Sequence, residues 1–192
     1  MIEEVRDHQF HFSWILVLLN RAFLHDSKCI VRWGVKTFLQ SDFHLLGLSS
    51  TYTYLNRFIL GPFILALGES YLFQKTEDNQ YDGTSPILAK LLESSFKSYF
   101  TTMPNSNFKT QFLEELTYNV CNISWSSTNL LYFSNIFACL ESDILISSAT
   151  FKNLSKILTW STSTHDVFCR SAIQTIILNS LIKHMNVSYF TL

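Results

Sequence analysis

Cys169, His165 and Asp166 come closest in this chain to the residue types and spacing of a nucleophilic site. A separation of four residues places Cys169 and His165 on one side of a helix, where the imidazole could take the thiol proton. A catalytic cysteine also needs an oriented base and a group that stabilises an oxyanion, and the surrounding sequence indicates neither. We therefore expect Cys169 to pack in the fold and predict no catalytic residue.

The histidines and the paired carboxylates indicate no other reactive site. His8 and His11 are the one close pair among six histidines, and no cysteine or carboxylate beside them completes a spacing typical of a metal site. Glu114 and Glu115 are adjacent, so on a helix they point in different directions and cannot act as an acid and base pair. We predict no metal ligand and no cofactor-binding residue in this chain.

Lys28, Arg32 and Lys36, here called the basic ridge, form the pattern with the clearest chemical meaning. They lie at positions i, i+4 and i+8, which places three cations on one side of a helix, and Arg21 precedes them. Such a ridge can hold an RNA phosphate backbone, because phosphate contacts require charge and position rather than base recognition. The alternative is a solvated helix face. Arg21, Lys28, Arg32 and Lys36 are our candidate RNA-binding residues.

The composition restricts the kind of protein that can carry this ridge. Of 192 residues, 47% are hydrophobic and only 15% are charged, and the net charge is −1. There is no overall attraction to nucleic acid or anionic lipid, so RNA binding would have to be local. Five glycines and three prolines are too few for an all-β fold with many tight turns, or for a glycine-dependent phosphate loop.

Hydrophobic periodicity predicts helices along most of the chain. Residues 14–39 read as two amphipathic helices separated by a turn at 25–27. An apolar segment at 51–74 should bend or divide near Gly61 and Pro62. Helical spacing recurs at 87–100, 108–120, 130–140, 149–160 and 166–185. Ser127 or Thr128 and Asp166 are expected to cap two of these helices.

These elements predict an all-α fold, an irregular HEAT- or armadillo-like α-solenoid of helical hairpins. The alternative is a single globular helical bundle. We expect one helical-repeat region over residues 1–192, divided into two sub-blocks by a polar loop near 75–85, with no catalytic domain. The abundance of apolar residues also fits a fragment of a longer chain.

The sequence predicts an intracellular protein, in the cytoplasm and/or the nucleus. The first residues are acidic rather than basic, and the apolar runs at 14–19 and 58–67 are shorter than the roughly 20 residues that cross a bilayer. Cys29, Cys121, Cys139 and Cys169 form no Cys-x-x-Cys pair, so we expect reduced thiols. No membrane partner is expected.

The hairpin at residues 20–39, which reads NRAFLHDSKCIVRWGVKTFL, resembles the helical-repeat region of the large eukaryotic tRNA guanosine 2′-O-ribose methyltransferases of the TAR RNA-binding protein 1 type. The resemblance implies an armadillo-like region that precedes a C-terminal knotted methyltransferase domain. It also implies S-adenosylmethionine as the cofactor of the full-length enzyme. The partners that it implies are tRNA and the protein's own C-terminal catalytic domain in a longer chain.

The glycines limit what this resemblance carries over. A knotted domain needs glycine-containing loops near its C-terminus to shape the methyl-donor pocket, whereas no glycine follows Gly83 here. We therefore expect a segment that is catalytically inert alone and binds no cofactor itself. Two classes of function remain: a scaffold segment of a tRNA methyltransferase, or a HEAT-like protein-binding scaffold without a nucleic-acid role.

Overall fold

All regular structure among the described residues is helical. The computed structural model describes residues 13–41, 53–69, 84–103, 106–140, 144 and 146–181. The helices are α1 (Ser13–Phe23), α2 (Lys28–Gln40), the π-helical turn η2 (Leu55–Ile59), α4 (Leu60–Glu69), α5 (Thr84–Thr102), α6 (Ser106–Asn122), α7 (Ser127–Ala138), α8 (Ser148–Ser163) and α9 (Val167–Ser180). Most of the predicted loop near 75–85 lies outside these residues, so the division into sub-blocks stays a prediction.

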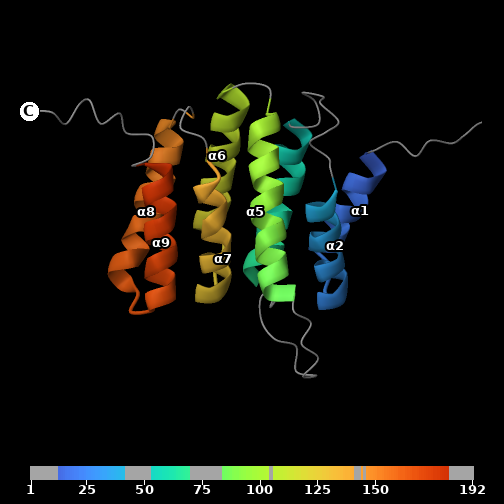
Figure 1. The fold of residues 1–192 in the computed structure, drawn as a ribbon, viewed down its shortest axis with the longest axis horizontal. Coiled ribbons are helices and arrows are strands. Elements are labelled where there is room, and N and C mark those ends of the chain that lie inside the picture. The colour runs from blue at the N-terminus through green and yellow to red at the C-terminus, as the bar shows by residue number, and fades with distance from the viewer. Residues whose placement is uncertain are drawn as a thin grey trace, which may run out of the picture.

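The helices form two stacked layers. One layer contains α1, α4, α6 and α8, and the other contains α2, α5, α7 and α9, with each helix packed on its neighbour in the same layer (Figure 1). In chain order, each helical hairpin therefore stacks on the one before it, from α1–α2 at one end to α8–α9 at the other. This arrangement confirms the predicted all-α, solenoid-like stack of hairpins rather than a closed bundle.

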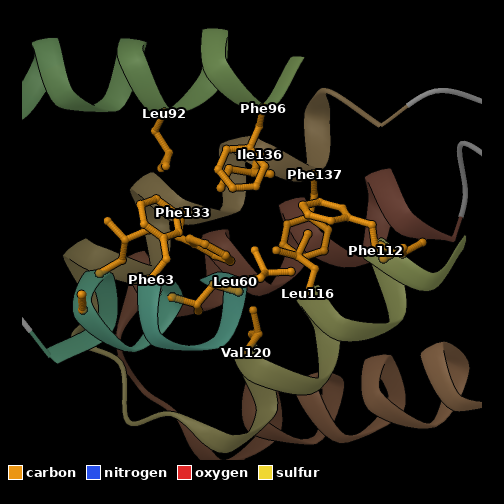
Figure 2. Close-up of a cluster of buried hydrophobic side chains, with 14 of the residues drawn as sticks. Leu60, Phe63, Leu92, Phe96, Phe112, Leu116, Val120, Phe133, Ile136 and Phe137 are labelled. Carbon is orange, nitrogen blue, oxygen red and sulfur yellow. The ribbon is translucent and has the colours of Figure 1, made fainter. Parts of the chain in front are cut away.

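The core is a continuous apolar seam between the layers. Figure 2 shows its central part, where side chains from α4, α5, α6 and α7 converge. Phe63, Phe96 and Phe112 link three of these helices, with ring centroids 6.1 Å apart for the first pair and 5.9 Å for the second. Full burial of one such side chain stabilises a fold by about 1.5–3 kcal/mol. Contacts between these three rings therefore help to hold the hairpins against each other.

The first hairpin has a close helix crossing. Gly34 of α2 lies against α1 so tightly that a Cβ at this position would be 2.8 Å from the Cβ of Ala22. The absence of a side chain lets the two backbones approach, and Phe23 and Val35 are buried beside this contact. The predicted turn at 25–27 is confirmed, with α1 ending at Phe23 and α2 beginning at Lys28.

The helix that contains Pro62 remains continuous through the expected break. A π-helical turn precedes the proline, and the Leu60 N–H donates to the Leu55 carbonyl. Pro62 has no N–H for the Phe58 carbonyl four residues earlier. That carbonyl instead accepts a hydrogen bond from the Asn20 side chain of α1 at 3.4 Å.

Side-chain caps define the starts of the last three helices. Ser126 caps α7 through Asn129 N–H, Ser147 caps α8 through Thr150 N–H, and Asp166 caps α9. The cap at Asp166 was predicted. The cap of α7 is Ser126 rather than Ser127 or Thr128, because Ser126 has the extended backbone of an N-cap whereas Ser127 is already the first helical residue. The Ser127 hydroxyl donates to Asp166 at 2.7 Å.

Candidate nucleic-acid interface

The basic ridge lies on α2 along one edge of its buried face, since Lys28 and Arg32 are each three and seven residues before a buried side chain. Val31, Gly34, Val35 and Leu39 form the buried face. Lys28 and Lys36 are exposed, and Arg32 is half-buried between them. No carboxylate occurs in α2, so the helix presents cations without an acidic residue of its own.

The start of α2 adds to the positive potential of the ridge. Ser27 precedes the helix, and its side chain makes no capping hydrogen bond. Lys28 is the first helical residue, where the helix dipole is positive and a cation disfavours the helix by about 0.3–1 kcal/mol. The positive end of the helix dipole and the cation of Lys28 together make this end of α2 electrostatically suited to an anion.

Two further lysines lie on α5, the neighbour of α2 in the same layer (Figure 1). Lys90 and Lys97 are exposed and seven residues apart, so they project from the same side of the helix. Glu93 is the one carboxylate of α5. Glu93 lies three residues after Lys90 and four before Lys97, so it shares their side of the helix. The layer arrangement thus places the helix that carries Lys90 and Lys97 next to the helix that carries the basic ridge, and we call the five cations together the α2–α5 basic surface.

The sequence prediction missed these lysines. Their seven-residue spacing was visible in the sequence, but the contact between α2 and α5 was not. Arg21, by contrast, lies on α1 in the other layer, one residue before the Ala22 that packs against α2. The structure therefore does not place Arg21 on the same helix layer as Lys28, Arg32 and Lys36.

A hollow of about 320 Å³ adjoins Lys28 at the turn between α1 and α2. His25 and Asp26 line it together with apolar residues of α1, α2 and α4. His25 is held in place because its Nδ1 accepts a hydrogen bond from the Ser27 N–H at 2.9 Å. Lys28 also lines this hollow, and the carboxylate of Asp26 gives it a mixed charge. The other four cations of the α2–α5 basic surface are therefore the stronger candidates for contact with phosphates.

Asp166, beside Cys169, caps the last helix and joins it to α7. One oxygen of Asp166 accepts hydrogen bonds from the N–H groups of Phe168 and Cys169 at 2.8 and 3.1 Å, and the other accepts from Ser127. These bonds, that of Ser127 first, lower the pKa of Asp166. Both carboxylate oxygens are therefore engaged in capping α9 and in joining it to α7.

Glu114 and the cysteines also have identifiable surroundings in the fold. Glu114 accepts a hydrogen bond from the Ser147 hydroxyl at 3.0 Å, which ties α6 to the start of α8. All four cysteines are free thiols, and burial raises the pKa of Cys121, an effect that the charge of Lys156 partly offsets.

Within the described part of the chain, no three His, Cys, Asp or Glu residues are grouped as they would be around a metal ion. None of the described helices combines the length and apolar character that a membrane crossing requires.

Comparison with known proteins identifies a similar tRNA-modifying enzyme. The chain is 27% identical over 184 residues to the tRNA (guanosine(18)-2'-O)-methyltransferase TARBP1 of Mus musculus, an alignment that covers 95% of this chain and 11% of that protein. The chain resembles a tRNA methyltransferase. The resemblance predicted from the hairpin at residues 20–39 is therefore confirmed, and it extends over nearly the whole chain. No protein-family model and no solved structure matches the chain.

Proposed function

We propose that this chain is a helical scaffold segment of an RNA 2′-O-ribose methyltransferase and helps to hold tRNA. The similarity to TARBP1 supports the methyltransferase context, including an intracellular location in the cytoplasm and/or the nucleus. In this proposal the stack is of the HEAT or armadillo type. It positions RNA for a C-terminal catalytic domain in a longer chain, and that domain binds S-adenosylmethionine.

The α2–α5 basic surface is the observation that carries RNA binding. Lys28, Arg32 and Lys36 lie on one helix, and Lys90 and Lys97 lie on its neighbour in the same layer. A rigid stack holds these cations in a fixed array, as a phosphate backbone requires. Since the chain as a whole has a net charge of −1, this array is a local feature rather than a consequence of a basic composition.

The direct test is tRNA binding at about 50 mM and about 200 mM salt, because each phosphate contact adds about 0.7–0.9 to the slope of log affinity against log salt. The variant Lys28→Gln, Arg32→Gln, Lys36→Gln should weaken binding and lower that slope by about 2–3. The pair Lys90→Gln, Lys97→Gln should lower it by about 1–2.

Lys152→Gln, Lys156→Gln is the matched control for the α5 pair. It also removes two exposed lysines from one helix, but this helix is α8 in the other layer. The control should bind tRNA as the parent does. Equal affinity and slope in the parent and both α2–α5 variants would refute RNA binding by this surface, and would favour a protein-binding scaffold.

Methyl transfer tests the second part of the proposal. The 192-residue chain should transfer no methyl group from S-adenosylmethionine to tRNA, because no glycine follows Gly83 to form the loops of a methyl-donor pocket. Radiolabelled S-adenosylmethionine is the appropriate readout. Stoichiometric or catalytic labelling of tRNA would show that this segment is an enzyme in its own right.

A further inference from the structure

The hollow at the turn between α1 and α2 has an apolar floor and a polar rim. Phe23, Val31 and Ala66 line it and are buried. His25 and Asp26 also line it, and both are exposed. Because Ala66 belongs to α4, the hollow lies at an internal junction between two consecutive hairpins. Its volume of about 320 Å³ is at the lower end of the range for ligand pockets, roughly 300–1,000 Å³, so it is large enough for one planar ring system.

The rim combines a pair of acceptors with donors. The Asp26 carboxylate has two oxygens side by side, and an ionised carboxylate only accepts hydrogen bonds. The His25 ring is oriented by the Ser27 N–H, which donates to its Nδ1 at 2.9 Å. The neutral ring therefore carries its proton on Nε2 and can donate from there. Lys28 adds a cation to this rim and also belongs to the α2–α5 basic surface.

Guanine is the RNA base whose edge matches a pair of acceptors. Its N1–H and N2–H groups are adjacent donors, and one carboxylate can accept from both. Adenine and cytosine each offer an amino group beside an acceptor nitrogen, which a carboxylate repels, and the N–H of uracil lies between two carbonyl oxygens. The O6 and N7 atoms of guanine are acceptors that suit a lysine. Charge complementarity with the rim therefore favours guanine over the other three bases.

The basic ridge leads to this hollow. Lys28 lines the hollow, and Arg32 and Lys36 follow it along α2 at intervals of four residues. A strand whose phosphates lie along the ridge thus has a base within reach of the hollow. The base must be unpaired, because Watson–Crick pairing occupies N1–H and N2–H, and proteins that read RNA sequence mostly do so at loops and bulges with splayed-out bases.

We propose that the hollow binds an unpaired guanine of an RNA whose phosphates lie on the α2–α5 basic surface. Asp26 accepts from the N1–H and N2–H groups, Lys28 donates to the acceptor edge, and the apolar floor packs against the ring. The inference rests on the proposed RNA binding. It adds a base preference, which phosphate contacts by themselves do not give.

The test compares short single-stranded RNAs that differ at one base. Uridine oligonucleotides with one central guanosine, adenosine, cytidine or inosine are titrated with the 192-residue chain at low salt and followed by fluorescence anisotropy. The guanosine oligonucleotide should bind about tenfold more tightly than those with adenosine or cytidine, as expected of one bidentate base contact. Inosine lacks the 2-amino group of guanosine and should lose most of this preference.

Two matched variants separate base recognition from charge. Asp26→Asn and Glu93→Gln each remove one exposed carboxylate, but Glu93 lies on α5 outside the hollow. Both variants should bind every oligonucleotide more tightly, because each removes a charge that repels phosphate. Asp26→Asn should also lose the guanosine preference, since the amide replaces one acceptor by a donor. Glu93→Gln should keep it.

The possible failures are distinguishable. Equal affinity for all the oligonucleotides, with salt-dependent binding retained, would overturn the guanine site and leave the proposed RNA binding intact. Absence of binding to any oligonucleotide would overturn RNA binding and this inference with it. A guanosine preference that survives Asp26→Asn would place the recognition elsewhere. Guanosine 5′-monophosphate is the last arm, because binding as tight as that of the guanosine oligonucleotide would assign the hollow to a free nucleotide instead of RNA.

Discussion

The Asn20 side chain donates a hydrogen bond to the Phe58 carbonyl at 3.4 Å, and this is the carbonyl that Pro62 leaves without its helical N–H. The contact joins α1 to η2 and lies in the same segment as the π-helical turn. A helix end or a proline must satisfy its unpaired backbone groups from elsewhere when they are buried. The Phe58 carbonyl is in an exposed part of the structure, and the hydrogen bond from Asn20 gives it a partner and also connects the first hairpin to the second.

The Asn20 contact should be energetically coupled to Pro62. Asn20→Ala should lower the free energy of unfolding by about 1 kcal/mol, because it removes one hydrogen bond. In a Pro62→Ala background, the N–H of residue 62 can donate to the Phe58 carbonyl. Asn20→Ala should then lower the free energy of unfolding by about 0.5–1 kcal/mol less than it does in the parent. Urea unfolding of the four proteins measures this coupling.

Asn122→Ala is the control for that cycle. Its amide donates to the Tyr118 carbonyl of its own helix at 2.8 Å, away from Pro62. It should show no coupling to Pro62→Ala beyond about 0.3–0.5 kcal/mol. An equal cost of Asn20→Ala with and without the proline would mean that the Phe58 carbonyl does not need the amide.

Gly34→Ala should destabilise the first hairpin even though alanine favours helix. The new Cβ would lie 2.8 Å from the Cβ of Ala22, and neither methyl can rotate away. Overpacking costs about 1–3 kcal/mol, against a propensity gain of about 0.8–1 kcal/mol, so we expect a net loss of about 1 kcal/mol. Thermal and urea unfolding will measure it.

The exchange variant Gly34→Ala, Ala22→Gly isolates the steric effect. It keeps one alanine and one glycine in the helix pair, so the two propensity changes cancel, and it removes the methyl contact. Stability should return to within about 0.5 kcal/mol of the parent. A double variant that is less stable than Gly34→Ala alone would place the cause outside this contact.

Much of the fold follows from periodicity, and its exceptions have identifiable tertiary causes. The hairpin at 14–39 was predictable because Leu19, Phe23 and Val35 recur at helical spacing around a polar turn. The continuity of the helix through Pro62 was not, because it involves a π-helical turn before the proline and a hydrogen bond from Asn20 of another helix. The hydrogen bond from Ser127 to Asp166 was not predictable either, because Asp166 follows in a later hairpin.

The candidate interface shows the same division between local and distant information. The three cations of α2 repeat every four residues, so the basic ridge was visible in the sequence. Lys90 and Lys97 join it because α5 packs beside α2, and a long intervening segment separates these helices in the chain. Only the layer arrangement shows that the two helices that carry these cations are neighbours.

Asp166 should make stability pH-dependent in acid. The hydrogen bonds from Ser127, Cys169 and Phe168 hold its pKa below the ordinary value of 3.8. Because the pKa of Asp166 is lower in the folded state than in the unfolded state, its carboxylate contributes fully to stability at pH values above the unfolded-state pKa. That contribution is lost as pH falls through the folded-state pKa. Asp166→Ala should therefore be less stable than the parent at about pH 7, and the difference should shrink below about pH 3.

Asp166→Asn separates capping from charge. Asparagine is as good an N-cap as aspartate but does not titrate, so this variant should keep most of the cap and lose the pH dependence. Urea midpoints at several pH values will distinguish the variants. A gap between parent and Asp166→Ala that is constant down to the lowest pH would show that the charge of the carboxylate contributes nothing.

Asn129 should be among the least replaceable polar residues of the stack. It is 2% exposed, and its amide donates to the Leu67 and Gly68 carbonyls at 2.9 and 3.2 Å. These carbonyls belong to the last turn of α4, where the helix supplies no N–H partner. Asn129→Ala should cost about 1–3 kcal/mol, because it leaves two acceptors without this donor.

Asn129→Asp is the sharper substitution because it preserves shape and removes the donor. Its carboxylate would face two carbonyl oxygens, so burial and repulsion should raise the pKa of the new acid above its unfolded value. The variant should thus lose stability as pH rises from about 4 to about 7. At neutral pH it should be less stable than the Asn129→Ala protein. Asn135→Asp, on the exposed side of α7, should change stability by no more than about 0.5 kcal/mol. An Asn129→Asp protein as stable as the Asn129→Ala protein at neutral pH would show that the α4 carbonyls do not depend on this donor.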